Sequence, residues 1–167
     1  GIQGDFGQGF DANGTDQGSA GITGGNASSF AYRDNDGEKY TAAGAGNGED
    51  YGDTYANNDI IGTIVDLDNG KIWWSKNGAV QSDGDPANGT GFAFDTLLSH
   101  SAYYEGMQYF PAVHIKHDGD TGTWHFNFGQ GDPDGDNNYT DSGGIGSFRY
   151  EPPEGFLALC TANMEEA

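Results

Sequence analysis

The chain has 167 residues, a length typical of a single domain, with 26 Asp and Glu against 6 Lys and Arg. The net charge of −20 would repel the phosphates of nucleic acids and of anionic membranes, so we expect no nucleic-acid partner and no membrane insertion. No apolar run is long enough for a membrane-spanning helix, and the single cysteine, Cys160, cannot form a disulfide within the chain.

Aromatic residues supply most of the side chains that could build a core. The chain holds 10 Phe, 9 Tyr and 3 Trp, whereas disordered chains of high charge are poor in aromatic residues. It also holds 30 Gly, far above the usual share of about 7%. Because Gly is frequent in turns, this composition predicts a folded, loop-rich protein with an aromatic core.

Residues 1–59 are dense in Gly, Asn, Asp and Ser and show no helical period. We interpret them as long ordered loops between short strands, with a flexible linker as the alternative. The clearest pattern follows, because residues 60–67 alternate as in a strand and residues 71–75 return as a second strand. An Asp-Asn-Gly sequence at 68–70 supplies the tight turn, so a β-hairpin is predicted here.

The rest of the chain continues as short strands and loops. We expect loops at 79–92 and 97–108, a second hairpin at 109–128 and an acidic loop at 130–147. The chain then ends in an extended segment, because Pro152-Pro153 prevents a helix. The whole pattern predicts an all-β fold with almost no helix, arranged as a sandwich or a barrel.

Several short motifs follow one another along the chain after residue 50. They are Asp59-Ile60-Ile61-Gly62, Asp66-Leu67-Asp68-Asn69-Gly70-Lys71-Ile72, Lys76-Asn77-Gly78, Tyr109-Phe110-Pro111-Ala112-Val113, Phe126-Asn127-Phe128-Gly129-Gln130, and Pro153-Glu154-Gly155-Phe156 with Ala158-Leu159-Cys160. In order and spacing they resemble the motifs of SPRY domains over roughly residues 50–161. The resemblance implies an antiparallel β-sandwich, related to the concanavalin A-like jelly-roll, that binds partners through loops and has no common catalytic apparatus.

The C-terminal sequence Gly155-Phe156-Leu157-Ala158-Leu159-Cys160-Thr161-Ala162-Asn163 is similar to the endings of SPRY-type segments in bacteriophage virion proteins. This similarity implies a non-enzymatic binding or structural module of a tail, fibre or decoration protein, located in the virion. Its partners would be other virion subunits, or a glycan or protein on the host surface. Two alternatives stay open: an intracellular, cytoplasmic SPRY adaptor that binds peptides, and a lectin-like or carbohydrate-active domain.

The resemblance also implies a domain organisation. Residues 1–49 would form a glycine-rich N-terminal part of the sandwich, residues 50–161 the SPRY-like core, and residues 162–167 a tail leading to a further segment, all within one domain. SPRY domains normally have further strands before the glycine-rich stretch, and their motifs are not present in this sequence. We therefore expect N-terminal strands to be missing and the chain to be part of a larger polypeptide or assembly.

Alternation along the strand at 71–75 separates its two tryptophans. Trp74 shares a face with Ile72 and is expected in the core, whereas Trp73 points to the opposite face. We expect Trp73 to face outward and to contact a ligand, with burial under a loop as the alternative. The other rings expected in the core are those of Phe110, Phe126, Phe128 and Phe156.

Recognition is expected to fall to the loops, because a sandwich buries its alternating residues. Tyr103, Tyr104 and Tyr139 lie in predicted loops and would stack on sugars or pack on a protein neighbour, together with Trp73. The strongly negative charge favours a basic or cation-bridged partner over an anionic one.

The acidic loop contains Asp132, Asp134 and Asp136 at alternate positions, an arrangement that suits a hard cation such as Ca²⁺. The loop departs from the EF-hand pattern, because Gly135 stands at its fourth position and Gly143 at the twelfth, where a bidentate Glu is needed. A solvated acidic loop without metal is the alternative. Calcium is therefore a candidate cofactor, and no other cofactor is expected.

Overall fold

The computed structural model describes residues 2–4, 29–41, 48–100, 103–113, 123–131 and 135–164, with only the backbone given for residues 2–4. The chain divides into two compact units. The first consists of residues 1–84 and 91–122, and the second consists of residues 85–90 and 123–167. All the strands described below belong to the first unit.

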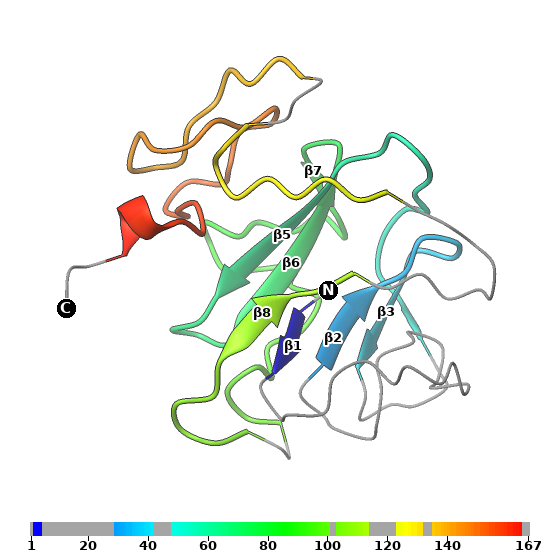
Figure 1. The fold of residues 1–167 in the computed structure, drawn as a ribbon. Helices are drawn as coiled ribbons and strands as arrows, with labels where there is room; N and C mark the ends of the chain where they lie inside the picture. Colours follow the sequence, from blue (N-terminus) through cyan, green and yellow to red (C-terminus); the bar gives the residue numbers. More distant parts are fainter. Residues whose placement is uncertain are drawn as a thin grey trace. The chain divides into compact units, whose positions relative to one another are not determined.

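The described residues are almost entirely strand and loop (Figure 1). One antiparallel sheet has the order β4-β3-β2-β1-β8, and a second has the order β5-β6-β7. The expected antiparallel all-β fold with almost no helix is confirmed. The strands are β1 Ile2–Gly4, β2 Ser29–Tyr32, β3 Glu38–Thr41, β4 Glu49–Asp50, β5 Ile61–Asp66, β6 Lys71–Lys76, β7 Ala79–Val80 and β8 Tyr109–Pro111, and a 3₁₀ helix, η2, spans Thr161–Asn163.

The predicted hairpin is present as β5 and β6, which pair in register from Ile61 opposite Lys76 to Asp66 opposite Lys71. Gly70 ends the connecting turn with φ +68°, a conformation that favours glycine. β6 then reverses into β7 through Asn77 and Gly78, both at positive φ, as a two-residue hairpin turn requires. Local sequence therefore determines this part of the fold.

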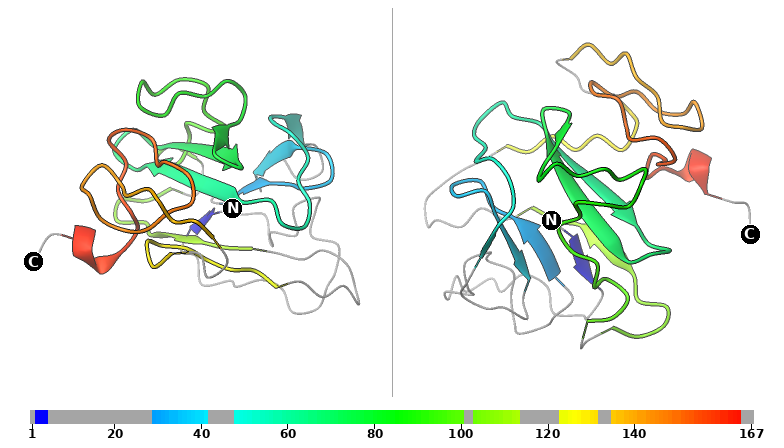
Figure 2. Two further views of the ribbon diagram at one scale, coloured as in Figure 1. Left: turned by 90° about the horizontal axis from the view of Figure 1, so that it is seen from above. Right: turned by 180° about the vertical axis from the view of Figure 1, so that it is seen from behind.

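The two sheets pack face to face through an aromatic core. Phe30 and Tyr32 of β2 lie in one buried cluster with Ile72 and Trp74 of β6. The rings of Tyr32 and Trp74 stack with centroids 5.9 Å apart and an interplanar angle of 22°. The sheets consequently lie one over the other as the two layers of a sandwich (Figure 2), and the predicted core position of Trp74 is correct.

The second predicted hairpin does not form. β8 pairs with β1, with Pro111 opposite Ile2, and not with the segment at 123–128. No strand is present at 123–131. A long-range partner from the start of the chain therefore replaces the expected local one, and Pro111 lies in the edge strand β8, where its missing N–H is tolerated.

Three rings expected in the core are exposed instead. The exposed fraction is 44% for Phe110, 44% for Phe126 and 38% for Phe128, and Phe156 is half-buried. Phe110 lies on the edge strand of its sheet, and the other two lie in the segment that forms no strand. The expectation was wrong because alternation shows that residues share a face, but not that this face is covered.

The second unit is organised around the buried carboxylate of Asp141. Its Oδ1 accepts the backbone N–H groups of Gly143 (2.9 Å) and Ile145 (2.8 Å). Its Oδ2 accepts the backbone N–H of Ala158 and the side-chain amide of Asn163, each over 2.7 Å. The hydrogen bond from the Ala158 N–H is the largest cause that lowers the pKa of Asp141 below its usual range, and the other three bonds lower it further. The carboxylate therefore stays ionised.

Candidate binding site

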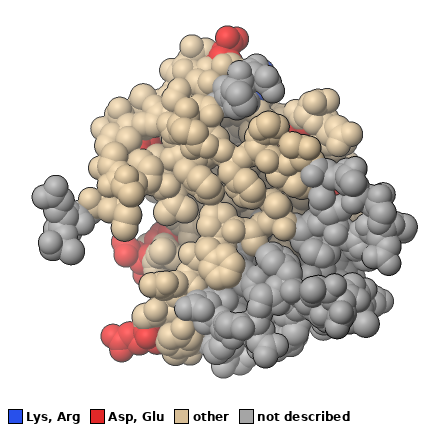
Figure 3. Space-filling view, viewed as in Figure 1, with Lys and Arg blue, Asp and Glu red and all other residues tan. Residues whose placement is uncertain are grey.

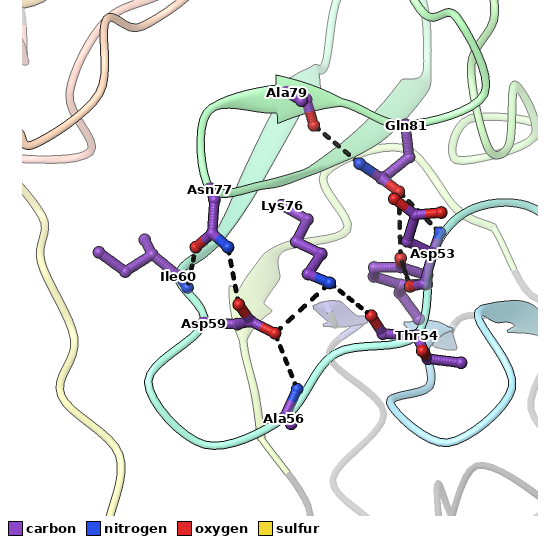
Figure 4. Close-up of polar contacts among 10 residues, drawn as sticks. Asp53, Thr54, Ala56, Asp59, Ile60, Lys76, Asn77, Ala79 and Gln81 are labelled. Carbon is purple, nitrogen blue, oxygen red and sulfur yellow. Dashed lines mark hydrogen bonds and ion pairs between the residues drawn. The ribbon is translucent and has the colours of Figure 1, made fainter.

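The loop between β4 and β5 is fastened to the β6–β7 turn by a polar network (Figure 4). Asn77 donates from Nδ2 to Asp59 Oδ1 over 2.6 Å and accepts the Ile60 N–H at Oδ1 over 2.9 Å. Lys76 Nζ lies 3.5 Å from Asp59 Oδ2 and donates to the Thr54 carbonyl over 2.7 Å. The hydrogen bond from Asn77 is the main cause that lowers the pKa of Asp59, so this carboxylate stays ionised to a lower pH than usual.

The buried side chain of Gln81, the residue that directly follows β7, anchors the same loop. Its Oε1 accepts the Asp53 N–H over 2.7 Å, and its Nε2 donates to the Ala79 carbonyl over 2.9 Å (Figure 4). The Tyr32 hydroxyl donates to the Asp53 carbonyl, and burial, together with the nearby Asp53, raises the pKa of Tyr32 to about 12. The backbone is thus fixed while the carboxylate of Asp53 stays exposed.

Two further aspartates, Asp66 and Asp85, accept hydrogen bonds within their own turns. Asp66 accepts the backbone N–H of Asn69 over 3.0 Å and its side-chain amide over 2.7 Å. In the second unit, Asp85 accepts the same two groups from Asn88 over 3.1 Å and 2.7 Å. These carboxylates therefore rigidify the loops and remain at the surface as negative charges.

Of the predicted contact residues, Tyr103 and Tyr104 lie in one anchored loop. Tyr104 is 44% exposed, and Tyr103 is half-buried, with its ring edge-on to His100 at 6.0 Å between centroids. The Tyr109 hydroxyl donates to the Leu97 carbonyl over 2.5 Å, so the 2.6 Å contact between Tyr109 and His100 requires the proton on His100 Nε2. Burial lowers the pKa of His100, in agreement with a neutral ring.

Trp73 does not face outward. Its exposed fraction is 0%, and the ring of Phe92 meets it edge-on with centroids 6.4 Å apart. Both faces of β6 are therefore covered, and the expected stacking of a ligand on Trp73 is wrong. Tyr139, which is 42% exposed, belongs to the second unit, where it forms a β-bridge with Phe148.

The calcium prediction falls largely outside the described residues. Asp132 and Asp134 are not described, and Asp136 is exposed. Within the described ranges no group of three or more His, Cys, Asp or Glu side chains is placed to hold a metal ion. A calcium site at these three aspartates stays a prediction.

Three exposed rings form a surface feature, which we call the aromatic strip: Trp124, Phe126 and Phe128. Of these, the sequence analysis assigned Phe126 and Phe128 to the core. Trp124 is 45% exposed, and the rings of Phe126 and Phe128 are nearly parallel, with centroids 5.8 Å apart. The alternation of these rings is visible in the sequence, but it is compatible with a strand buried in the core as well as with an exposed segment. No further sequence signal distinguishes the two placements.

A hollow of about 560 Å³ opens beside the aromatic strip. Trp124 and Phe126 contribute its apolar wall, and Gln130, Asn137 and Ser147 contribute polar groups. All of its lining residues belong to the second unit. No Lys, Arg, Asp or Glu is among the described residues that line it. The side-chain groups available for contact are the two aromatic rings, the imidazole of His125, and the amide and hydroxyl groups of the polar residues.

The described Lys and Arg side chains of the first unit are all engaged within the fold. Three lie over aromatic rings, and the fourth, Lys76, pairs with Asp59. The three are Arg33 over Tyr40 at 4.5 Å, Lys39 over Phe94 at 5.1 Å and Lys71 over Phe92 at 5.0 Å. On the side of the molecule drawn in Figure 3, the described residues are mostly uncharged, with a few Asp and Glu and very little Lys or Arg.

Among the described residues, no helix has the length and apolar character needed to cross a bilayer. Two antiparallel sheets packed on a shared aromatic core define the class of the fold as a β-sandwich. The SPRY domain model matches residues 6–131, and the chain belongs to the SPRY domain family. SPRY domains are in general non-catalytic protein-interaction domains.

A relative in the curated proteins is described as an ATP-dependent RNA helicase Ddx1 from Drosophila melanogaster. It is 28% identical over 119 residues, which cover 71% of this chain and 12% of that protein. The chain therefore spans about an eighth of the length of this relative. No solved structure matches the chain significantly.

Proposed function

We propose that the chain is a non-catalytic SPRY module that binds a protein partner rich in Lys and Arg. The observation that carries this proposal is the charge: −20 for the chain, with the described cations of the first unit already held by rings and a carboxylate. A partner that supplies positive charge gains from this field, whereas an anionic partner is repelled. Membership of the SPRY family supports protein binding as the mode of action.

The anchored loops supply the contact surface in this proposal. The networks of Asp59 and Gln81 order the loop at 51–60 before binding, so less entropy is lost when a partner docks. The exposed Tyr104 adds an apolar ring with a polar tip, and Tyr103 and Tyr139 have the same character.

Two settings suit such a module, and each has its own support. The C-terminal sequence at 155–163 supports a structural protein of a phage virion, which would bind neighbouring subunits or the host surface. The similarity to a much longer RNA helicase supports an adaptor module, carried inside a cell by a larger protein. Mass spectrometry of purified particles and of host lysate separates the settings: peptides of this chain that co-purify with particles support the virion.

Selection from a random peptide library with the immobilised chain tests the proposed partner. We expect the enriched peptides to carry net positive charge. A Tyr104→Ala variant should retain fewer of them, whereas Leu67→Ala, at a 54% exposed position in the β5–β6 turn, should select as the unmodified chain does. Enrichment of neutral or acidic peptides, or turnover of peptides by the purified chain, would contradict the proposal.

A further inference from the structure

The aromatic strip is an unusual surface for a chain this rich in charge. Trp124, Phe126 and Phe128 have exposed fractions of 45%, 44% and 38%, and they occupy alternate positions of one short segment. Exposed apolar groups that gather in one place mark interaction sites more often than those scattered singly. The hollow of about 560 Å³ beside them gives the surface a concave shape that can receive a side chain.

The kind of side chain that would bind in the hollow follows from two properties of this surface: its exposed aromatic rings and the negative charge of the second unit. The second unit contains nine acidic residues against one basic residue, Arg149, a net charge of −8. The face of an aromatic ring attracts a cation, and Trp does so most strongly. A cationic side chain is therefore favoured twice, by the ring beneath it and by the surrounding negative charge.

The first unit shows the same preference within its own fold. Arg33, Lys39 and Lys71 each lie over an aromatic ring at 4.5–5.1 Å. In contrast, no described Lys or Arg lies over a ring of the aromatic strip. The strip thus presents ring faces of the kind that hold cations elsewhere in this protein, without a described cation of its own.

The hollow favours arginine among the cations. Its guanidinium is planar, stacks on ring faces and is weakly hydrated, so it loses less on leaving water than an ammonium group does. The Gln130 and Asn137 side chains and Ser147 line the hollow beside the two rings. Gln130 Oε1 already accepts the Phe128 N–H over 2.7 Å, and an amide oxygen has a second lone pair that can accept another N–H group. An Arg side chain in the hollow would therefore have the rings of Trp124 and Phe126 and the Gln130 oxygen among its neighbours.

We propose that the aromatic strip and its hollow are the docking site for an arginine of the partner, within an extended basic segment. This inference rests on the proposed function, because it names the place where one arginine of the basic partner docks. An extended segment fits because its alternate side chains are roughly 6.6 Å apart, close to the 5.8 Å between the ring centroids of Phe126 and Phe128.

The test titrates the chain with a fluorescent peptide of alternating Arg and Ser, and with the same peptide carrying citrulline in place of Arg. Citrulline keeps the shape of Arg and removes its charge. We expect the Arg peptide to bind and the citrulline peptide to bind at least about tenfold more weakly, a loss of roughly 1.4 kcal/mol. The double variant Trp124→Ala/Phe126→Ala should lose a similar factor, whereas Tyr150→Ala, an exposed ring in the same unit, should bind as the unmodified chain does.

NMR of the unmodified protein keeps the test decisive if the double variant does not fold. The indole N–H signal of Trp124, assigned from its loss in Trp124→Phe, should shift on addition of the Arg peptide, and those of buried Trp73 and Trp74 should not. Binding of the Arg peptide without any shift of Trp124 would overturn the docking site and leave the proposed function standing. Failure of every basic peptide to bind would overturn the proposed function itself. Shifts of Trp124 with neutral cellohexaose but not with the Arg peptide would assign the strip to a sugar and overturn the arginine site.

Discussion

At the scale of single residues, burial separates the three tryptophans. Trp73 and Trp74 are fully buried on opposite faces of β6, whereas Trp124 is nearly half exposed. We predict that Trp73→Ala lowers the free energy of unfolding by about 3–5 kcal/mol, because it leaves a large cavity against Phe92. Urea unfolding measures the loss, with Leu67→Ala as an exposed control expected to stay within about 0.5 kcal/mol. Equal stability of the two variants would mean that Trp73 is not a core residue.

Asp141 makes the second unit sensitive to pH. Its pKa is lowered in the folded state, chiefly by the Ala158 N–H, so the ionised carboxylate stabilises the fold above its unfolded pKa of about 3.9. This stabilisation is lost as the pH falls through the lower, folded pKa. Hydrogen exchange of the Ala158 and Ile145 amides should therefore show full protection at neutral pH and reduced protection below about pH 4.

The variant Asp141→Asn separates this effect from general acid unfolding. Its amide group places a donor among four N–H donors, so we expect protection to be reduced already at neutral pH and to change little below pH 4. Unchanged protection in the variant at neutral pH would contradict the role given to Asp141.

At the scale of elements, the β5–β6–β7 meander was predictable and the larger sheet was not. Alternation, the Asp-Asn-Gly turn and the Asn-Gly turn all act within twenty residues, so they specify that meander locally. The pairing of β8 with β1 joins residues more than a hundred positions apart, which no local pattern specifies. Alternation likewise placed Trp73 and Trp74 on opposite faces but could not show that both faces are covered.

The candidate binding site could be predicted only in part, because a local sequence pattern does not show which side chains the rest of the fold covers. Tyr104 was predictable as an exposed ring because it follows no strand pattern. The aromatic strip alternates like a core strand, and only the absence of strand pairing at 123–131 reveals its exposure. The networks around Asp59 and Gln81 join residues from separate loops, so their partners could not be named from the sequence.

Asn77 is predicted to connect the β6–β7 turn to the loop at 51–60. Replacing it by Gly keeps the positive φ of 50° accessible and keeps the backbone bond to the Ile60 carbonyl, but it removes the side-chain hydrogen bonds to Asp59 and to the Ile60 N–H. We expect a loss of about 1–2 kcal/mol in urea unfolding and faster exchange of the Ile60 amide. Asn58→Gly is the matched control, since Asn58 also has positive φ (72°), and it should leave the Ile60 amide unchanged. Equal exchange in both variants would show that the Asn77 bonds do not hold the loop.

At the scale of the whole molecule, the charge of −20 opposes folding as well as selecting partners. Raising NaCl from about 0.01 M to about 0.15 M shortens the screening length from roughly 30 Å to roughly 8 Å. We predict a rise of a few degrees in Tm, because repulsion between the carboxylates is weakened. Choline chloride should give the same rise if screening is the cause, whereas a Tm that does not increase would mean that self-repulsion is negligible.

The central claim is that this SPRY module recognises a basic protein segment through its negative field. The most direct measurement is the dissociation constant of the Arg-Ser peptide, determined by calorimetry at about 0.05 M and about 0.5 M NaCl. The account predicts binding of one peptide per chain at low salt and about tenfold weaker binding at high salt, a difference near 1.4 kcal/mol. An affinity that is the same at both salt concentrations, or no binding at low salt, would contradict the account.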